Sequence, residues 1–288
     1  MSILEQLAID TAVVREAIVR FIHDEVTQSG HRRALLGLSG GIDSALAAYL
    51  AVEALGRENV LALLMPYRSS NPSSEADARL VLDELGIPHR LCPITPMVDA
   101  FIALDPGMDA RRQGNLMSRC RMVISYDQSV PFGGLVLGTS NKSEILLGYF
   151  TLYGDSAAAL RPLANLYKCQ LRQLARAVGV PERIVAKAPS ADLWEDQTDE
   201  GELGFTYDEA DQILFLHVDR GYDEGRIVAA GFAPELVQRV LRRLRVRRRR
   251  GPGRAGRAGR RARVRGRADR PRRARAAARA APRPHHRG

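Results

Sequence analysis

Apolar residues follow two alternating patterns along most of the chain. Consecutive apolar residues form short runs at RRALLGL (32–38), VLALLMP (60–66), HRLCPI (89–94) and GLVLGT (134–139). Between these runs, apolar residues recur every three or four positions, which is the spacing of amphipathic helices. Buried strands that alternate with helices of about 10–15 residues predict βαβ units and a doubly wound parallel sheet.

The helices expected from this spacing alternate with the strands. They span 3–29, 44–55, 74–86, roughly 114–127 and 167–179, followed by three short helices of which the last covers 234–245. Residues 188–204 are acidic and lack periodicity, so we expect them to form a loop. The sequence therefore predicts one α/β domain with further helices appended after its last strand.

The 288 residues have the composition of a soluble globular protein, with 45% hydrophobic and 26% charged side chains. No run of about 18 apolar residues exists, so a membrane span is not expected. The first residues, MSILEQLAID, lack the basic segment and apolar core of a secretory signal. Three scattered cysteines fit neither a disulfide framework nor a zinc cluster, and we expect the protein to be cytoplasmic.

The net charge of +10 conceals two regions of opposite sign. Residues 247–288 contain 18 Arg, no Lys and one acid, Asp269, and so carry +17, which leaves −7 for residues 1–246. Apart from the prolines, Val264 is the only side chain larger than alanine there that could enter a core. We therefore expect a folded domain over 1–246 and a disordered tail rich in Arg, Ala, Gly and Pro over 247–288.

Two interpretations of this tail remain open. As a selected sequence, it would be a polycationic arm for nucleic acid or acidic surfaces. Alternatively, Arg, Ala, Gly and Pro are the residues that a shifted reading frame through a GC-rich gene would give, since their triplets begin largely with G and C. The composition changes inside an amphipathic helix rather than at a linker, which favours the shifted frame.

The segment SGGIDS (39–44) lies between a predicted strand and a predicted helix. Its two glycines permit a tight turn, and the start of the helix presents N–H groups to an anion. Asp43 makes sense beside a phosphate if it binds the Mg²⁺ that neutralises the phosphates. The GK[ST] ending of a Walker A loop is absent, which weakens a kinase or GTPase interpretation. The plainer alternative is a strand-to-helix turn without a ligand.

A second polar cluster, GTSNKSE (138–144), follows the strand expected at 134–139. Open α/β sheets bind ligands at the carboxyl ends of their strands. Thr139 can donate a hydrogen bond to a nucleotide, and Glu144 can face the crevice as a metal ligand. The alternative for Glu144 is a carboxylate that is stabilised by the helix dipole alone. Taken together at neighbouring strand ends, Asp43 and Glu144 predict a shared Mg²⁺ site.

These motifs, in this order, resemble those of the NAD synthetases, and SGGIDS resembles the pyrophosphate loop of the N-type ATP pyrophosphatases. The resemblance also includes GYFTLYGD (148–155), RPLANLYK (161–168), APSADLW (188–194) and DEGELGFTYDEAD (199–211). It implies a Rossmann-like, adenine nucleotide alpha hydrolase-like fold with a five-stranded parallel sheet, in a homodimer. The implied enzyme is a carbon–nitrogen ligase that adenylates nicotinic acid adenine dinucleotide (deamido-NAD), after which ammonia displaces AMP to give NAD⁺.

The resemblance assigns roles to individual residues. It places Mg²⁺ on Asp43 and Glu144, deamido-NAD on Arg119 and Asp155, and catalysis on Asp155, near the ammonia site, and on Lys168. It places the co-substrate ATP on Gly37, Leu38, Ser39, Gly40, Gly41, Ile42, Asp43, Ser44, Thr139, Lys168 and Ser190.

The chemistry accounts for two of these residue types without the resemblance. Adenylation brings two anions together, and Mg²⁺ with Lys168 would offset their repulsion. Ammonium predominates at neutral pH, so a buried acid such as Asp155 could bind it and accept its proton. The plainer interpretation of Lys168 is a solvated lysine at a helix start, although that is an unfavourable place for a cation.

Several positions depart from the family pattern. Leu152 and Ala159 stand where some members have a lysine and an aspartate at the dinucleotide site, and the arginine tail replaces a basic pair near the C-terminus. For DPGMDARRQGN (105–115), a mobile segment that closes on substrate and a solvated loop are both open. Trp194 could cover the site or simply anchor the acidic loop.

We expect an ammonia-using enzyme without a preceding amidase domain, with no membrane contact and with nucleic-acid contacts only through the tail and only non-specific. Two rival functions remain open. One is another N-type ATP pyrophosphatase, such as a tRNA-thiolating enzyme, although scattered cysteines and an acidic body oppose it. The other is a nucleotide-binding fold tethered to nucleic acid by residues 247–288, whose binding would be sensitive to salt.

Overall fold

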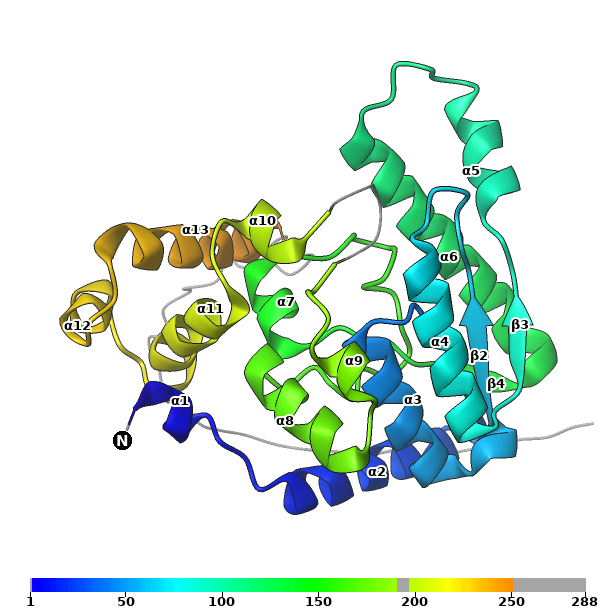
Figure 1. Ribbon diagram of the computed structural model, residues 1–288, viewed down its shortest axis with the longest axis horizontal. Helices are drawn as coiled ribbons and strands as arrows, with labels where there is room; N and C mark the ends of the chain where they lie inside the picture. Colours follow the sequence, from blue (N-terminus) through cyan, green and yellow to red (C-terminus); the bar gives the residue numbers. More distant parts are fainter. Residues whose placement is uncertain (1, 191–196, 251–288) are drawn as a thin grey trace, which may run out of the picture. The chain divides into compact units, whose positions relative to one another are not determined.

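Among the residues that the structure describes, four parallel strands form one sheet in the order β3-β2-β1-β4 (Figure 1). The computed structural model describes residues 2–190 and 197–250, with side chains as far as Leu244. The strands are β1 (Arg33–Gly37), β2 (Val60–Leu64), β3 (His89–Leu91) and β4 (Gly134–Val136). This order, with the chain running outwards on both sides of β1, confirms the predicted parallel α/β sheet.

Helices precede, separate and follow the strands (Figure 1). They are α1 (Ile3–Gln6), α2 (Thr11–Gln28), α3 (Ile42–Leu55), α4 (Pro72–Leu85), α5 (Thr95–Ile102), α6 (Ala110–Phe132), α7 (Lys142–Leu147), α8 (Lys168–Val178), α9 (Glu182–Val185), α10 (Asp199–Leu203), α11 (Tyr207–Leu214), α12 (Glu224–Ala229) and α13 (Pro234–Arg250). None of the described helices combines the length and apolar character needed to cross a membrane.

Side chains of the sheet alternate between two apolar layers. Ala34 and Leu36 of β1 belong to the layer that contains residues of α2, α3, α4 and α8. Leu35, between them, belongs to the layer that α6 completes with Ile124 and Phe132. Because both faces of the central strands β1 and β2 are covered, these strands consist mainly of consecutive apolar residues, and each fully buried leucine contributes about 1.5–3 kcal/mol.

A second apolar cluster lies beside α7 and α8, built mainly from the last helices (Figure 1). Helix α13 contributes Val237, Val240, Leu241 and Leu244, each at most 2% exposed. Leu7, from the other end of the chain, is buried in the same cluster. The C-terminal helices therefore support the elements that follow β4.

The predicted helix over 3–29 is wrong as a single element. Two helices occupy this range, and Asp10 begins the second by accepting hydrogen bonds from the N–H groups of Ala12 and Val13. The apolar spacing continues across the break because Leu7 packs against the C-terminal cluster while Ile18 and Ile22 pack against the sheet. The periodicity was thus produced by two different packing surfaces.

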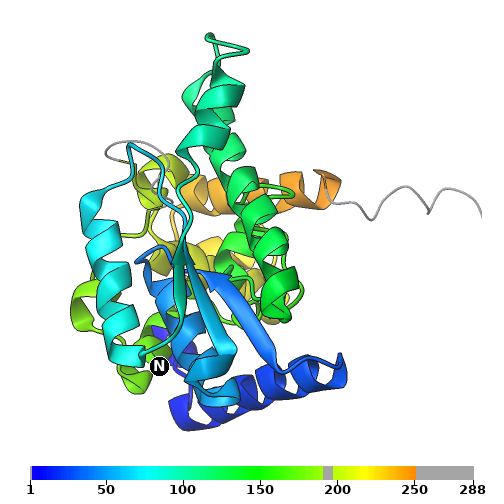
Figure 2. The ribbon, with the colours of Figure 1, turned by 90° about the vertical axis from the view of Figure 1, so that its right-hand side faces the viewer.

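Other boundaries also differ from expectation. Helix α5 was not predicted, and α6 begins at Ala110, so the second half of 105–115 is helical rather than a loop. Figure 2 shows α5 and the start of α6 extending beyond the carboxyl ends of the strands. Residues 199–203, expected in a loop, form α10, because Thr198 caps them through the N–H of Gly201.

The implied fifth strand is reduced to an isolated parallel bridge between Leu137 and Leu160. The N–H of Gly138 donates to the carbonyl of Leu160 at 2.8 Å, next to β4. Two residues later the chain reaches Pro162, whose nitrogen has no hydrogen to donate to a ladder. Pairing therefore stops after one bridge, and four strands rather than five are formed in the described residues.

Candidate active site

The loop between β1 and α3 is held by its own hydroxyl groups. The N–H of Ser39 donates to Oγ of Ser44 at 3.2 Å, and that hydroxyl donates to the carbonyl of Gly41 at 3.0 Å. Gly41 is the N-cap of α3 and makes no side-chain cap hydrogen bond. The start of α3 therefore combines a fixed turn with backbone N–H groups that suit an anion.

Gly40 brings this loop against the first turn of α4. Its φ is +80°, and a Cβ at this position would lie 2.1 Å from the carbonyl oxygen of Ser74. Any larger residue would combine a disfavoured backbone conformation with a steric clash. Glycine is thus required at position 40, and α4 forms the back wall of the loop.

Asp43, in the first turn of α3, meets the start of α7. Asn141 caps α7 by accepting the N–H of Glu144 at 3.0 Å, while the Glu144 carboxylate accepts the N–H of Asn141 at 3.3 Å. The side-chain amide of Asn141 also donates to Oδ1 of Asp43 at 2.7 Å. One capping residue therefore orients both predicted metal-binding carboxylates.

Lys168, the first residue of α8, joins the two carboxylates. Its Nζ lies 2.5 Å from Oδ2 of Asp43 and 3.3 Å from Oε1 of Glu144. The side chain of Lys168 is 2% exposed, so the interpretation of a solvated lysine is wrong. Three residues from β1–α3, β4–α7 and α8 thus form one charged cluster beside the loop.

The cluster contains two acids and one base, and its pKa values reflect this. Burial, and then repulsion from Asp43, raise the pKa of Glu144 to about 8, against the attraction of Lys168. Burial alone would lower the pKa of Lys168, but Asp43 and Glu144 outweigh it and raise this pKa above its usual value. Glu144 therefore keeps a proton near neutral pH, and a further cation at the site would take the place of that proton.

Two carboxylates with oxygen donors suit Mg²⁺, which prefers oxygen and commonly binds one or two carboxylates together with substrate phosphates. The side chains of Asp43 and Glu144 keep 19% and 16% of their surface exposed, which leaves room for an ion that arrives with a nucleotide. In the described parts of the chain, no group of three His, Cys, Asp or Glu residues could hold a metal by itself. Asp43 and Glu144 therefore fit a Mg²⁺ ion that arrives bound to the nucleotide.

Asp155 lies in a separate turn that packs against α6. Its Oδ1 accepts the hydroxyl of Ser118 and the N–H of Thr151, each at 2.8 Å. A Cβ at Gly154 would lie 2.3 Å from Oγ of Ser118, so this contact requires glycine. Desolvation by the surrounding protein raises the pKa of Asp155 despite these hydrogen bonds. The residue itself is exposed, so the expectation of a buried acid is wrong.

Arg119 follows Ser118 on α6 and reaches the same turn. Its Nε donates to the carbonyl of Leu152 at 3.3 Å, and its side chain is exposed. The next residue in the turn, Tyr153, is 64% exposed and has a φ of +60°, which costs a non-glycine residue about 1 kcal/mol or more. Leu152 is 44% exposed and Ala159 is also exposed, so neither supplies a charge to this surface.

The other predicted nucleotide-binding residues lie on adjacent segments. Thr139 is half-buried between β4 and α7. Ser190 is exposed, and the preceding Pro189 accepts the N–H of Asp199 at 2.9 Å. Trp194 lies outside the described residues.

Sequence reasoning missed several polar residues that support the site. The carboxylate of Asp211, on α11, is fully buried and accepts the hydroxyl of Ser143 and the N–H of Cys169. Ser143 also accepts the N–H of Lys168 at 2.9 Å, so Asp211 fixes the residues beside both Glu144 and Lys168. Burial raises the pKa of Asp211 to about 6. Only Asn141 carried a local signal, the capping-box spacing to Glu144.

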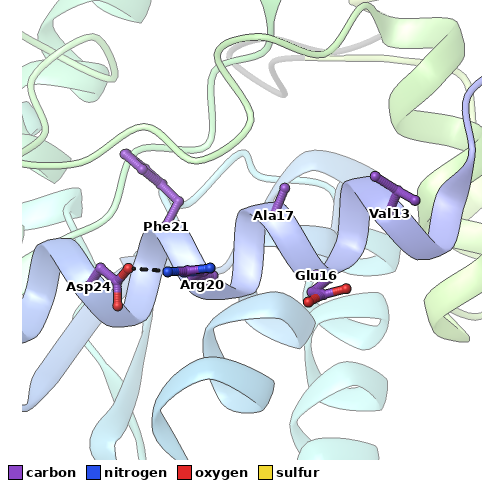
Figure 3. A pocket seen from close by; sticks show the side chains of 6 residues that line it. All are labelled: Val13, Glu16, Ala17, Arg20, Phe21 and Asp24. Carbon is purple, nitrogen blue, oxygen red and sulfur yellow. Dashed lines mark ion pairs between the residues drawn. The ribbon is translucent and has the colours of Figure 1, made fainter.

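A hollow of about 460 Å³ elsewhere on the surface does not belong to this cluster. It is lined only by residues of α2, namely Val13, Glu16, Ala17, Arg20, Phe21 and Asp24 (Figure 3). One helix face cannot enclose a ligand, so the hollow is no rival to the charged cluster beside α3.

Comparison with known proteins extends over nearly the whole described chain. A family model described as NAD synthase matches residues 14–250. The NH₃-dependent NAD⁺ synthetase of Trichlorobacter lovleyi is 54% identical over 237 residues, which cover 82% of this chain and 87% of the relative. Asp43, Glu144 and Lys168 all lie within the residues that the family model matches.

Solved structures are similar over the same extent. The NMN synthetase of Francisella tularensis has a TM-score of 0.73 and 33% identity, covering 84% of this chain and 97% of that one. The NH₃-dependent NAD synthetase of Campylobacter jejuni, solved with nitrate, has a TM-score of 0.71 and 34% identity, covering 83% and 96%. The fold and the sequence thus point to one family.

Proposed function

We propose roles for the individual residues of this chain, which belongs to the NAD synthase family and catalyses the ammonia-dependent synthesis of NAD⁺. The carboxylate of deamido-NAD attacks the α-phosphorus of ATP and releases pyrophosphate. Ammonia then attacks the adenylated carbonyl, AMP leaves, and the amide of NAD⁺ remains. The single observation that carries this division is the buried contact of Lys168 with Asp43 and Glu144 beside the loop at 39–44.

The loop at 39–44 and the start of α3 bind the phosphates of ATP. This assignment is supported by the uncapped N-terminus of α3 and by the hydroxyls of Ser39 and Ser44. Thr139 and Ser190, at neighbouring segment ends, complete the ATP site in this proposal. Lys168 stabilises the negative charge that develops on the departing pyrophosphate, since its pKa is raised and it stays protonated.

Asp43 and Glu144 hold the Mg²⁺ that accompanies ATP. The ion, when bound, supplies positive charge to the phosphates and so offsets the repulsion between the two anionic substrates. The raised pKa of Glu144 supports this assignment, because an acid in that state gains from a nearby cation. Asn141 keeps both carboxylates oriented before the ion arrives.

Asp155 binds ammonium and accepts the proton that ammonium must lose before it can attack. Its raised pKa makes it a stronger base than an aspartate with an ordinary pKa. Ser118 and Thr151 fix the carboxylate, while Arg119 on the same helix contacts the dinucleotide. Leu152 and Ala159 add no charge there, so Arg119 is the main cation for the phosphates of deamido-NAD in this part of the chain.

We further propose that residues 1–246 form the catalytic domain, in a cytoplasmic homodimer. Val123, Tyr126 and Val130 support the dimer, since these apolar side chains are 49%, 40% and 80% exposed and recur at helical spacing on α6. A stripe of this kind suits a second copy of the chain. Residues 247–288 have no part in catalysis in this proposal.

The decisive assay follows NAD⁺ formation from deamido-NAD, ATP and Mg²⁺ with ammonium, and with glutamine as the control nitrogen source. Turnover with ammonium alone is expected. A parallel reaction with nicotinic acid mononucleotide is included because the similar Francisella protein is an NMN synthetase. Faster turnover of nicotinic acid mononucleotide would identify that compound, instead of deamido-NAD, as the substrate. Failure with both compounds would overturn the proposed reaction.

A further inference from the structure

A buried carboxylate lies where α4 supports the phosphate-binding loop. A Cβ at Gly40 would lie 3.1 Å from Cβ of Asp77, in addition to its clash with the carbonyl of Ser74. Asp77 is only 3% exposed. A carboxylate buried to this extent requires compensating positive charge, since its desolvation would otherwise cost several kcal/mol, on the order given for buried ions.

Two cations from the segment at α9 supply that charge. Nζ of Lys187 lies 2.9 Å from Oδ2 of Asp77 and 3.2 Å from Oγ of Ser74, and Nη2 of Arg183 lies 2.5 Å from Oδ1. Within the described residues, Oδ1 of Asp77 accepts no hydrogen bond, so the ion pair with Arg183 is the interaction that compensates the burial of this oxygen. The Lys187 side chain is 29% exposed and that of Arg183 is 59% exposed, which makes Lys187 the more sheltered partner.

The segment that carries Lys187 leads directly to the ATP site. Ser190 lies three residues beyond it, and Pro189 accepts the N–H of Asp199 at 2.9 Å. Asp199 is itself buried, and its Oδ2 accepts the hydroxyl of Tyr207 at 3.2 Å. Residues 187–190 are therefore attached at one end to α4, behind the phosphate loop, and at the other end to α10.

We propose that Asp77 and Lys187 are positioning residues of the nucleotide site, whose ion pair fixes residues 187–190 against the phosphate loop so that Ser190 is preorganised for ATP. This inference rests on the proposed function, because it requires ATP at the loop. Neither side chain touches the reacting atoms in this scheme. Loss of the pair therefore weakens ATP binding, since the segment must be ordered when ATP binds, and leaves the chemical step largely intact.

The test compares Lys187→Met, Lys187→Arg and Asp77→Asn in the full chain, with Arg176→Met as the matched control. Arg176 forms an exposed ion pair with Glu182 of α9 at 3.0 Å, and within the described part of the chain it forms no ion pair with α4 or with the loop at 39–44. We measure KM for ATP, KM for deamido-NAD and kcat, and the Kd of Mg²⁺ with nonhydrolysable α,β-methylene-ATP by calorimetry.

K187M and D77N are expected to raise both the KM and the Kd for the nucleotide about tenfold, with kcat within about twofold. K187R should recover most of the affinity, and R176M should match the wild type. Unchanged ATP affinity in K187M and D77N overturns the proposal, as does a loss in kcat alone or a failure of K187R to rescue. If K187M does not fold, Lys187→Gln takes its place.

The wild-type chain separates this inference from the proposed function. If the wild type makes no NAD⁺, the proposed function fails, whereas calorimetry still reports whether the Asp77–Lys187 pair controls nucleotide affinity. If the wild type makes NAD⁺ and the variants bind ATP normally, the positioning role of the Asp77–Lys187 pair is excluded and the proposed function stands.

Discussion

Nζ of Lys168 lies 2.5 Å from Oδ2 of Asp43, across a separation of 125 residues in the sequence. The ammonium group is almost completely buried, and a ring of Tyr207 lies beneath it at 5.2 Å. This buried cation lies between two carboxylates next to the start of α3, where the proposed mechanism places the phosphates of ATP. This relationship therefore predicts the largest effect among single substitutions at the site.

Lys168→Met should lower kcat for NAD⁺ formation about 100- to 1,000-fold, because a preorganised charge at the departing phosphate is lost. Pyrophosphate release, measured separately from NAD⁺ formation, should fall by the same factor, since adenylation is the affected step. Lys142→Met is the matched control, because Lys142 pairs with Asp219 at 2.8 Å instead of with Asp43 or Glu144. Equal turnover of Lys168→Met and wild type would remove Lys168 from the mechanism.

Glu144→Gln should stabilise the protein at alkaline pH when Mg²⁺ and ATP are absent. The folded-state pKa of Glu144 is about 8, above its ordinary 4.5, so the folded protein keeps a proton that the unfolded chain has lost. The unfolding free energy of the wild type therefore falls as the pH rises from about 4.5 to about 8. Glutamine does not titrate and removes this loss.

We expect the advantage of E144Q to grow by about 3–4 kcal/mol between pH 5 and pH 8, as measured by urea unfolding in EDTA. Glu75→Gln, at an exposed ion pair with Arg79, serves as the control and should show no such growth. Adding Mg²⁺ with ATP should reverse the order, because the ion stabilises only the wild-type pair of carboxylates. A difference between E144Q and wild type that is constant with pH would contradict the assignment.

Asp155→Asn should separate the two half-reactions. Asparagine can still accept the hydrogen bonds from Ser118 and Thr151 through its oxygen, so the turn should persist. It cannot take a proton from ammonium, and we expect KM for ammonium to rise at least about tenfold while pyrophosphate release stays within about threefold. Coupled loss of both steps would instead make Asp155 a residue of adenylation or of structure.

The strands and the turn at 39–44 could be predicted from the sequence because their signals are local. Leu35, Leu36 and their neighbours are buried on both faces of the sheet and so form a continuous apolar run, and two glycines mark the turn that follows. The break between α1 and α2 could not be predicted, because Leu7 keeps helical spacing while it packs against residues some 200 positions later. The helical spacing of apolar residues indicates that they are buried, but not which part of the chain they pack against.

Among the charged residues of the site, too, some contacts could be predicted from the sequence and others could not. Asp43 and Glu144 stand at strand ends, where topology alone brings them together, whereas nothing in the segment of Lys168 places that residue beside them. Asp77 and Asp211 resemble surface acids on amphipathic helices in the sequence, and only the folded chain shows that both are buried with specific partners. Support for a site from distant elements leaves no local signature, since each partner is an ordinary polar residue in its own segment.

The C-terminal boundary gives the last prediction. Truncation after Arg250 should leave the midpoint of thermal unfolding and the turnover unchanged, because it keeps the whole of α13, including the buried Leu241 and Leu244, and the family match ends at 250. Truncation after Val240 removes Leu241 and Leu244, both 2% exposed, and should cost about 3 kcal/mol or more for each lost leucine.

The truncation after Arg250 also tests the rival function, in which the basic tail tethers the protein to nucleic acid. Salt-sensitive DNA binding should disappear with residues 251–288 while NAD⁺ formation persists, and a loss of turnover in that truncation would show that the basic segment takes part in catalysis.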